Sequence, residues 1–341
     1  MRSTGARAGE ADPSPHRARV LRSTLERMSR RVAELPPRTL LVSLACIQWL
    51  LVVSVAVAVG HDGSLWIVIP QVLVLMPVLL LLVYETARRL GGRLFAAWAA
   101  IVWIALPYAG LAYANPSLRH DYAHQFLPRV LGLADDPRFP AMVAFLAAIF
   151  LTMRALETSS GVDVAIAVAA AALGAAFAPR AALVALAPVV GLAVGGSKRH
   201  AIAAAAALAV LLAGVGIAVD TGLLSTPFAH LETHGPAGTL ASLSENFWSG
   251  RVLEWLAIAG VAGALRGRLP VGAMIGVALV ATLFSLPTGP TPLATNLALL
   301  HALVPVWGAV ALAIASIPLL VPRRQTAGGT QARTTAESLA P

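Results

Sequence analysis

Few residues in this chain could carry out chemistry, and most of them fall between apolar segments. In Arg119-His120-Asp121-Tyr122-Ala123-His124, His120 and His124 are four residues apart. On a helix they would share one face, which suits two imidazoles on one metal ion. A second group follows at His230, Glu232 and His234. Neither group completes a zinc signature such as H-E-x-x-H, and loop histidines are commonly solvent-exposed. We therefore assign no metal ligands and leave a divalent cation as an open cofactor.

Two carboxylates are candidate catalytic residues, Asp62 and Asp121. Asp62 follows the first apolar segment directly, in Gly60-His61-Asp62-Gly63, where a fixed carboxylate could act as a general base or hold a metal. The competing interpretation is an Asp-Gly turn between two helices. We predict that the two carboxylates approach within about 10 Å across one outward cavity, close enough to serve one small substrate.

Arg180 is the most specific candidate for substrate binding, because apolar runs flank it on both sides in Phe177-Ala178-Pro179-Arg180-Ala181. A charge at membrane depth is costly and usually faces a cavity or a partner. A guanidinium also suits phosphate, although an arginine that reaches to lipid headgroups is an equal alternative. Glu254 and His301 sit near the outer ends of their segments, and Glu254 is spaced to pair with Arg251. The candidate substrate-binding residues are thus Arg180, His120, His124, Glu254 and His301.

The apolar background decides the fold class. The chain is 58% hydrophobic and 12% charged, and its mean hydropathy is +0.77. Its apolar runs are too long for strands, and several approach the roughly 20 residues that a helix needs to cross a bilayer. We predict an all-α, polytopic membrane helical bundle with about ten spans, at 39–60, 65–86, 94–113, 140–156, 162–178, 181–195, 201–219, 252–265, 269–286 and 297–321. The pair 162–178 and 181–195 is either two tilted spans or a broken helix pair.

Basic residues orient these spans. With both termini in the cytoplasm, 20 of the 25 Lys and Arg residues lie inside and 5 outside, as the positive-inside rule requires. Residues 1–38 form a basic cytoplasmic tail, in which Leu21, Leu25 and Met28 have the spacing of an amphipathic helix; a solvated tail is the alternative. The bundle covers 39–321, and 322–341 is predicted to be a disordered cytoplasmic tail.

Charge and cysteine content exclude other classes. The pI is near 11.0, but the excess arginine lies in tails and short loops, which argues against nucleic-acid binding. The single cysteine, Cys46, rules out an internal disulfide. One lysine among the basic residues, with abundant Ala and Val, is typical of a GC-rich bacterial genome. We predict a multi-pass protein of the bacterial plasma membrane, with the lipid bilayer as its first partner.

Two stretches resemble the GT-C glycosyltransferases, in the branch of protein mannosyltransferases and the lipid A aminoarabinose transferase. The first runs from Val83 to Ala97 and is followed by an apolar span ending Ala105-Leu106-Pro107; it is similar to a Y-x-x-A-R-R-L-x-G-R junction. The second, 172–188, resembles a small-residue helix that reaches a basic residue, here Arg180, and continues to Leu186-Ala187-Pro188. The resemblance implies transfer of a sugar from a polyprenyl-phosphate donor to an extracytoplasmic acceptor, with an acidic residue after the first span.

One departure keeps other functions open. The family has a long outer loop after its first span, whereas this chain has only about His61 to Ser64. A non-catalytic scaffold or partner subunit is therefore one alternative. A small-molecule or lipid transporter is another, although the polar residues gather at one face and the two halves show no clear repeat.

Overall fold

The computed structural model describes residues 36–60, 63–113, 119–222, 252–284 and 300–321, and every regular element within them is a helix. The all-α prediction is therefore confirmed for this part of the chain. The predictions for most of the N-terminal tail, for the C-terminal tail and for Asp62 fall outside the described residues.

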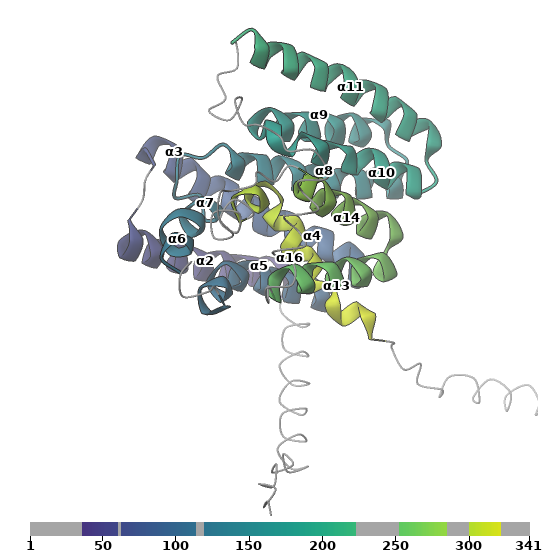
Figure 1. The fold of residues 1–341 in the computed structure, drawn as a ribbon. Helices are drawn as coiled ribbons and strands as arrows, with labels where there is room; N and C mark the ends of the chain where they lie inside the picture. The colour runs from purple at the N-terminus through teal and green to yellow at the C-terminus, as the bar shows by residue number, and fades with distance from the viewer. Residues whose placement is uncertain (1–35, 61–62, 114–118, 223–251, 285–299, 322–341) are drawn as a thin grey trace, which may run out of the picture.

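Helical stretches follow the apolar segments in chain order (Figure 1). In the described ranges they are α2 (Pro37–Val59), α3–η1–α4 (Leu65–Pro70, Gln71–Leu75, Met76–Gly91), α5 (Arg93–Tyr113), α8 (Arg138–Thr158), α9 (Gly161–Phe177), η3–α10 (Pro179–Leu186, Ala187–Val194), α11 (Lys198–Asp220), α13 (Val252–Gly267), α14 (Leu269–Phe284) and η4–α16–η5 (Val304–Val306, Trp307–Ala315, Ile317–Leu320). A short stretch between α5 and α8 consists of α6 (Arg119–Asp121), η2 (Tyr122–Phe126) and α7 (Leu127–Val130).

Four of these stretches are long and apolar enough to cross a membrane: Pro37–Val59, Leu65–Gly91, Arg138–Thr158 and Lys198–Ala218. The protein is thus a membrane protein by the composition and length of its helices. The four helical stretches differ in the share of their residues that is buried inside the protein. In the most apolar window of α8, 61% of residues are buried, against 17% for α2 and for α11. Helix α8 is therefore central, whereas α2 and α11 lie at the edge, and Figure 1 shows α11 beyond α9. Their exposed apolar faces are suited to lipid.

Close packing of the last helices depends on two glycines. A Cβ atom on Gly260 would lie 2.0 Å from the carbonyl oxygen of Ala313, and one on Gly263 would lie 2.1 Å from that of Ser316. Helix α13 therefore lies directly against the backbone of α16 and the turn after it. This use of small residues is typical of helix contacts in membranes, where close backbone approach replaces hydrophobic burial.

Prolines account for the departures from α-helical geometry. The π-helix η1 follows Pro70, and η2 precedes Pro128, because a proline cannot donate the hydrogen bond that continues the regular ladder. Pro179 starts the 3₁₀ helix η3, which continues as α10. The predicted segment 181–195 is therefore separate from α9 and helical along most of its length, with a break in the backbone at Ala181 (φ −89°, ψ 15°) and a change of pitch at Ala187.

Candidate functional site

The best-formed polar site lies at the start of α8. Asp136 lies two residues before Arg138, the first residue of the helix, and its Oδ1 accepts the backbone N–H of Arg138 at 3.0 Å, which satisfies one of the free N–H groups at the helix start. Gln71 holds the loop before Asp136. In the amide orientation that satisfies its nitrogen and oxygen, the side-chain nitrogen of Gln71 donates to the carbonyls of Gly132 (2.9 Å) and Ala134 (3.2 Å). Asp136 is thereby fixed where the chain enters α8.

Two arginines hold the buried Asp136 carboxylate. Arg138 Nε donates to Oδ1 at 2.8 Å and to Oδ2 at 3.0 Å, and Arg129 Nε, from α7, lies 3.2 Å from Oδ2. Burial alone would raise the pKa of Asp136, but the hydrogen bonds and charge of Arg138, with the charge of Arg129, hold this pKa below its ordinary value. The carboxylate therefore stays ionised and anchors both guanidinium groups.

His301 joins these arginines from a distant part of the sequence. Arg138 Nη1 donates to the His301 carbonyl at 3.1 Å, and Arg129 Nη1 lies 3.1 Å from each ring nitrogen of His301. Because a guanidinium N–H only donates, the facing ring nitrogen accepts, and the imidazole is uncharged in this arrangement. The start of the last helical stretch is in this way tied to α7 and α8.

Arg180 completes what we call the Arg138 cluster: Arg129, Asp136, Arg138, Arg180 and His301. Arg180 is the second residue of η3, and its Nη2 is enclosed with no hydrogen-bond partner among the described residues. Three guanidinium groups and one carboxylate leave the described cluster with an excess of two positive charges. An anion with several oxygens would offset this excess and bind the free guanidinium nitrogen.

The predicted catalytic segment lies beside this cluster. Asp121 is half-exposed on α6 and accepts a hydrogen bond of 3.3 Å from Gln125, while His120 and His124 are exposed with ring centroids 4.3 Å apart. The two histidines thus share a face as predicted. Tyr122 is buried and donates to the carbonyl of Pro107 at 2.7 Å, which fixes the segment to α5.

No group of three or more His, Cys, Asp or Glu side chains within the described ranges could hold a metal ion. The paired imidazoles of His120 and His124 alone do not form a complete site of the zinc kind, so we derive no step that uses a metal.

Two predicted site residues cannot be placed. Asp62 lies outside the described residues, and for Glu254 the structure describes the helix but not the side chain. The neighbour of Asp62, Gly63, lies against the start of the site, because a Cβ there would be 2.9 Å from the backbone nitrogen of Asp135. The predicted approach of Asp62 to Asp121 stays a prediction.

Sequence reasoning missed Arg129, Asp136 and Arg138 as members of a site. A signal was present, because the positive-inside rule makes arginine rare in outer segments. Of the five basic residues assigned to that side, three belong to the Arg138 cluster: Arg129, Arg138 and Arg180. An arginine that breaks the charge rule needs a local reason, and for Arg129 and Arg138 that reason is their ion pairs with Asp136.

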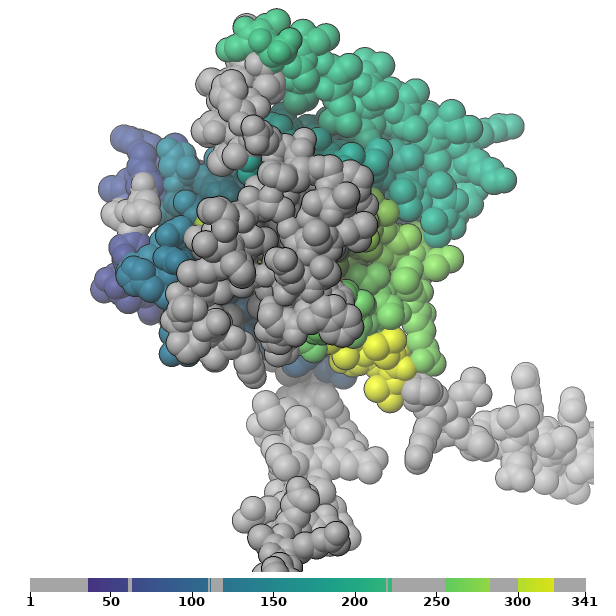
Figure 2. All heavy atoms as spheres, in the orientation of Figure 1, coloured from purple at the N-terminus to yellow at the C-terminus, as the bar shows by residue number. Residues whose placement is uncertain are grey.

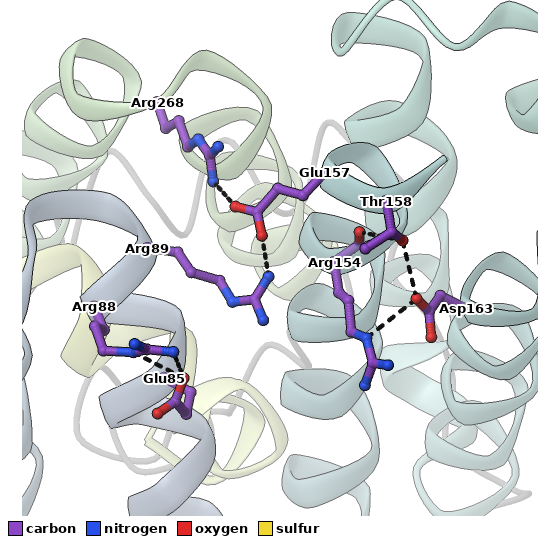
Figure 3. Close-up of polar contacts among 8 residues, drawn as sticks. All are labelled: Glu85, Arg88, Arg89, Arg154, Glu157, Thr158, Asp163 and Arg268. Carbon is purple, nitrogen blue, oxygen red and sulfur yellow. Dashed lines mark hydrogen bonds and ion pairs between the residues drawn. The ribbon is translucent and has the colours of Figure 1, made fainter. Parts of the chain in front are cut away.

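The opposite ends of these helices carry a different kind of polar contact (Figure 3). Glu157, at the end of α8, bridges Arg89 of α4 and Arg268, which precedes α14. Arg89 also lies over the Phe150 ring, 4.8 Å from its centroid. We call Arg89, Glu157 and Arg268 the Glu157 network.

Two further ion pairs flank the Glu157 network in Figure 3. Arg88 pairs with Glu85 at 2.7 Å, and Arg154 with Asp163 at 3.2 Å. Each arginine drawn there has an acidic partner, so these contacts are accounted for by joining helices. Arg89 Nε is enclosed without a hydrogen-bond partner, as Arg180 Nη2 is, but the Arg89 guanidinium pairs with Glu157, whereas no ion pair among the described residues holds Arg180. The Arg138 cluster is therefore the stronger candidate for binding.

Comparison of the chain with models of protein families, with curated proteins and with solved structures finds no match to any of them. What the protein does has to be inferred from its own residues.

Proposed function

We propose that the chain crosses the bacterial plasma membrane ten times, with both termini in the cytoplasm. The contacts between helix ends support this arrangement. Segments assigned to the inner side meet one another in the Glu157 network, and segments assigned to the outer side meet in the Arg138 cluster. Length supports it as well. Eight residues of 3₁₀ helix and eight of α-helix give η3–α10 a length of at most about 28 Å, reduced by the break at Ala181, against the roughly 30 Å of a hydrocarbon core.

We propose that the protein binds the phosphate of a polyprenyl-phosphate sugar at the outer face and transfers the sugar to an extracytoplasmic acceptor. One observation carries this proposal: the enclosed, unpartnered Nη2 of Arg180 in a cluster with two further arginines, both paired with Asp136. A buried donor without an acceptor costs free energy, so a phosphate oxygen is the natural partner. The resemblance to GT-C glycosyltransferases places a basic residue at the same position.

The excess charge of the cluster suits the transfer step. An acceptor hydroxyl oxygen attacks the anomeric carbon, the bond from that carbon to the phosphate oxygen breaks, and the electron pair leaves with the phosphate. The phosphate thereby changes from a diester with one negative charge to a monoester with nearly two. Two excess positive charges match the product better than the substrate. Such groups stabilise charge as it develops in the transition state, which is the condition for catalysis.

The proton of the acceptor hydroxyl has to pass to a base, and we propose Asp121, a half-exposed carboxylate on the stretch that carries Arg129, for this role. It precedes Arg129 by eight residues on one short helical stretch, about 12 Å of helix. Asp62 stays the second proposed base, on sequence grounds alone. The roles proposed for His120 and His124 are to orient Asp121 or bind the acceptor; Glu254 and His301 are proposed to contact the sugar and the cluster respectively.

Binding of geranyl phosphate to the purified protein tests the phosphate site directly. Arg180→Ala should weaken binding at least about tenfold, since hydrogen bonds to charged groups contribute about 1.5–3 kcal/mol. Arg180→Lys should keep part of it. Arg154→Ala, at the other end of the same bundle, is the matched control and should bind normally. Full binding by a folded Arg180→Ala protein would show that the phosphate role is wrong.

A non-catalytic lipid-binding partner subunit is the second candidate. It is favoured by the state of Asp136, the carboxylate of the cluster, which is already engaged by two arginines and a backbone N–H and is not free to act as a base. Release of polyprenyl phosphate from labelled polyprenyl-phosphate hexoses and pentoses separates the two. Binding without any release, in the presence of extracted envelope acceptors, would favour the partner subunit.

A further inference from the structure

The Glu157 network lies where three helical stretches begin or end. Arg89 is two residues before the end of α4, Glu157 is one residue before the end of α8, and Arg268 directly precedes α14. The stretches Leu65–Gly91 and Arg138–Thr158, which contain the first two of these residues, are long and apolar enough to cross a membrane. In a bilayer the network therefore lies at the level of the lipid headgroups.

Both arginines of the network keep donors that the shared carboxylate does not use. Each guanidinium donates to Glu157 through its Nη1, and within the described ranges the Nε and Nη2 groups have no hydrogen-bond partner. Arg89 Nε is enclosed, whereas the side chain of Arg268 is 40% exposed. Two arginines and one glutamate also leave the network with an excess of one positive charge. A phosphate group supplies both the missing acceptors and the missing charge.

A partly exposed stripe of α8 leads to the same place. Most of this helix is buried, but Val143, Ala147 and Phe150 are partly exposed and are spaced three or four residues apart on one face. The Arg89 guanidinium lies over the Phe150 ring, 4.8 Å from its centroid. Arg154, the next residue on this face, pairs with α9. The stripe is therefore flanked by α4 and α9, and its apolar part ends beneath Arg89 (Figure 3).

We infer that the Glu157 network binds the phosphate of an anionic phospholipid with one net negative charge, and that an acyl chain of this lipid lies along the stripe of α8. The charge of such a lipid equals the excess charge of the network, whereas a zwitterionic phospholipid brings a cation close to Arg89 and Arg268. The inference uses neither the Arg138 cluster nor the transfer reaction. Only the assignment of this lipid to the inner leaflet rests on the proposed topology.

A lipid bound in this way stabilises the contact between α4, α8 and α14. Two arginines meet at one carboxylate, and a second negative group reduces the repulsion between their charges. Because the lipid binds the folded protein, it raises the unfolding temperature according to its affinity.

Four substitutions separate a defined site from general attraction to a basic surface. Arg268→Gln and Arg89→Gln each lower the excess charge of the network from one to zero, and Glu157→Gln raises it to two. Arg88→Gln is the matched control, because it removes one positive charge from the neighbouring position of α4, where Arg88 pairs with Glu85 at 2.7 Å. If Arg89→Gln is unstable, Arg268→Gln, at a more exposed position, carries the test.

The experiment measures binding of dioctanoyl phosphatidylglycerol and dioctanoyl phosphatidylcholine to the full-length protein in a non-ionic detergent. The two lipids have the same chains, so their partition into detergent is similar. Wild type and Arg88→Gln should prefer phosphatidylglycerol at least about tenfold, the effect of one hydrogen bond to a charged group. Arg268→Gln and Arg89→Gln should lose this preference. Glu157→Gln should bind phosphatidylglycerol at least about threefold more tightly than wild type, since solvent weakens the added charge at this exposed position.

A third ligand tests the position of the chain. Glycerophosphoglycerol, the same headgroup without chains, should bind at least about tenfold more weakly than phosphatidylglycerol, since each buried CH₂ favours binding. Equal affinity for these two ligands would show that a free phosphodiester is sufficient and that the stripe holds no chain. Equal binding of the two lipids by wild type, or the same loss of preference in Arg88→Gln as in Arg268→Gln, would show that the network is not a lipid site. None of these results depends on binding at the Arg138 cluster, so the two proposals fail separately.

Discussion

Replacing Asp136 with asparagine should have opposite effects on stability and on phosphate binding. The carboxylate is buried, and it accepts from the backbone and side chain of Arg138 and pairs with Arg129. Removing one partner of a buried ion pair typically costs about 3–5 kcal/mol. Arg129 is 31% exposed, and solvent will stabilise part of its charge, so we expect a loss of about 2–3 kcal/mol.

The affinity of Asp136→Asn for phosphate should increase, although its stability falls. Asp136→Asn raises the excess charge of the described cluster from two to three. One added charge about 6 Å from a phosphate contributes about 2.8 kcal/mol per phosphate charge at an effective dielectric constant of about 20, before screening by salt. After a discount of about half for screening, geranyl phosphate should bind at least about tenfold tighter. The less stable protein is thus expected to be the better anion binder.

Thermal unfolding in detergent, with and without geranyl phosphate, measures both effects, because a ligand that binds the folded state raises the unfolding temperature according to its affinity. Asp163→Asn is the matched control. Asp163 is also buried and paired with an arginine, Arg154, at the other end of α8. It should lose stability and leave binding unchanged. Weaker binding by Asp136→Asn would refute the view that Asp136 sets the excess charge of an anion site.

Two further predictions concern pH and topology. Because the pKa of Asp136 is below its ordinary value of 3.8, its stabilisation is complete above that value and is lost only as pH falls below it. Asp136 therefore stays ionised between pH 5 and 7.5, whereas a phosphate monoester, with its second pKa near 6, gains charge over this range. Binding of geranyl phosphate should strengthen with rising pH more than binding of a dialkyl phosphate does, and equal pH dependence for both ligands would contradict this. In cysteine-accessibility experiments on a Cys46→Ser background, cysteines at Asp121 and Lys198 should label from opposite sides of the membrane, and labelling from the same side would rule out the proposed topology.

The helices could be predicted from the sequence because their cause is local. An apolar run cannot leave its backbone polar groups unpaired in lipid, so each segment becomes helical whatever surrounds it. The same holds for the shared face of His120 and His124, which depends only on helical spacing. The 3₁₀ geometry after Pro179 was less accessible, because proline marks a break without fixing the pitch of the helix that follows.

The Arg138 cluster could not be predicted in full, because its members come from four separate elements. Arg129 and His301 are 172 residues apart, and no spacing rule connects them. Arg180 could be singled out from its apolar surroundings alone, but the identity of its neighbours depends on how α8 and α9 pack. The sequence could have flagged Asp136 only through its position between arginines of an outer segment, a weaker pattern than a catalytic motif.

The pitch change in η3–α10 also bears on how the protein is made. As an ordinary α-helix, sixteen residues would reach only about 24 Å. That length is too short for the translocation channel to release the segment efficiently into the bilayer as a membrane span. The segment gains its length only after η3 forms, and η3 packs against α9 and α14. In the proposed topology, α9 and η3–α10 would then enter the bilayer together as a hairpin with Arg180 near its tip. Moving that arginine across the membrane costs about 2.5–3.5 kcal/mol on insertion scales. Retaining an arginine at this position thus makes biogenesis harder, and replacing it with leucine should give a chain that inserts more readily.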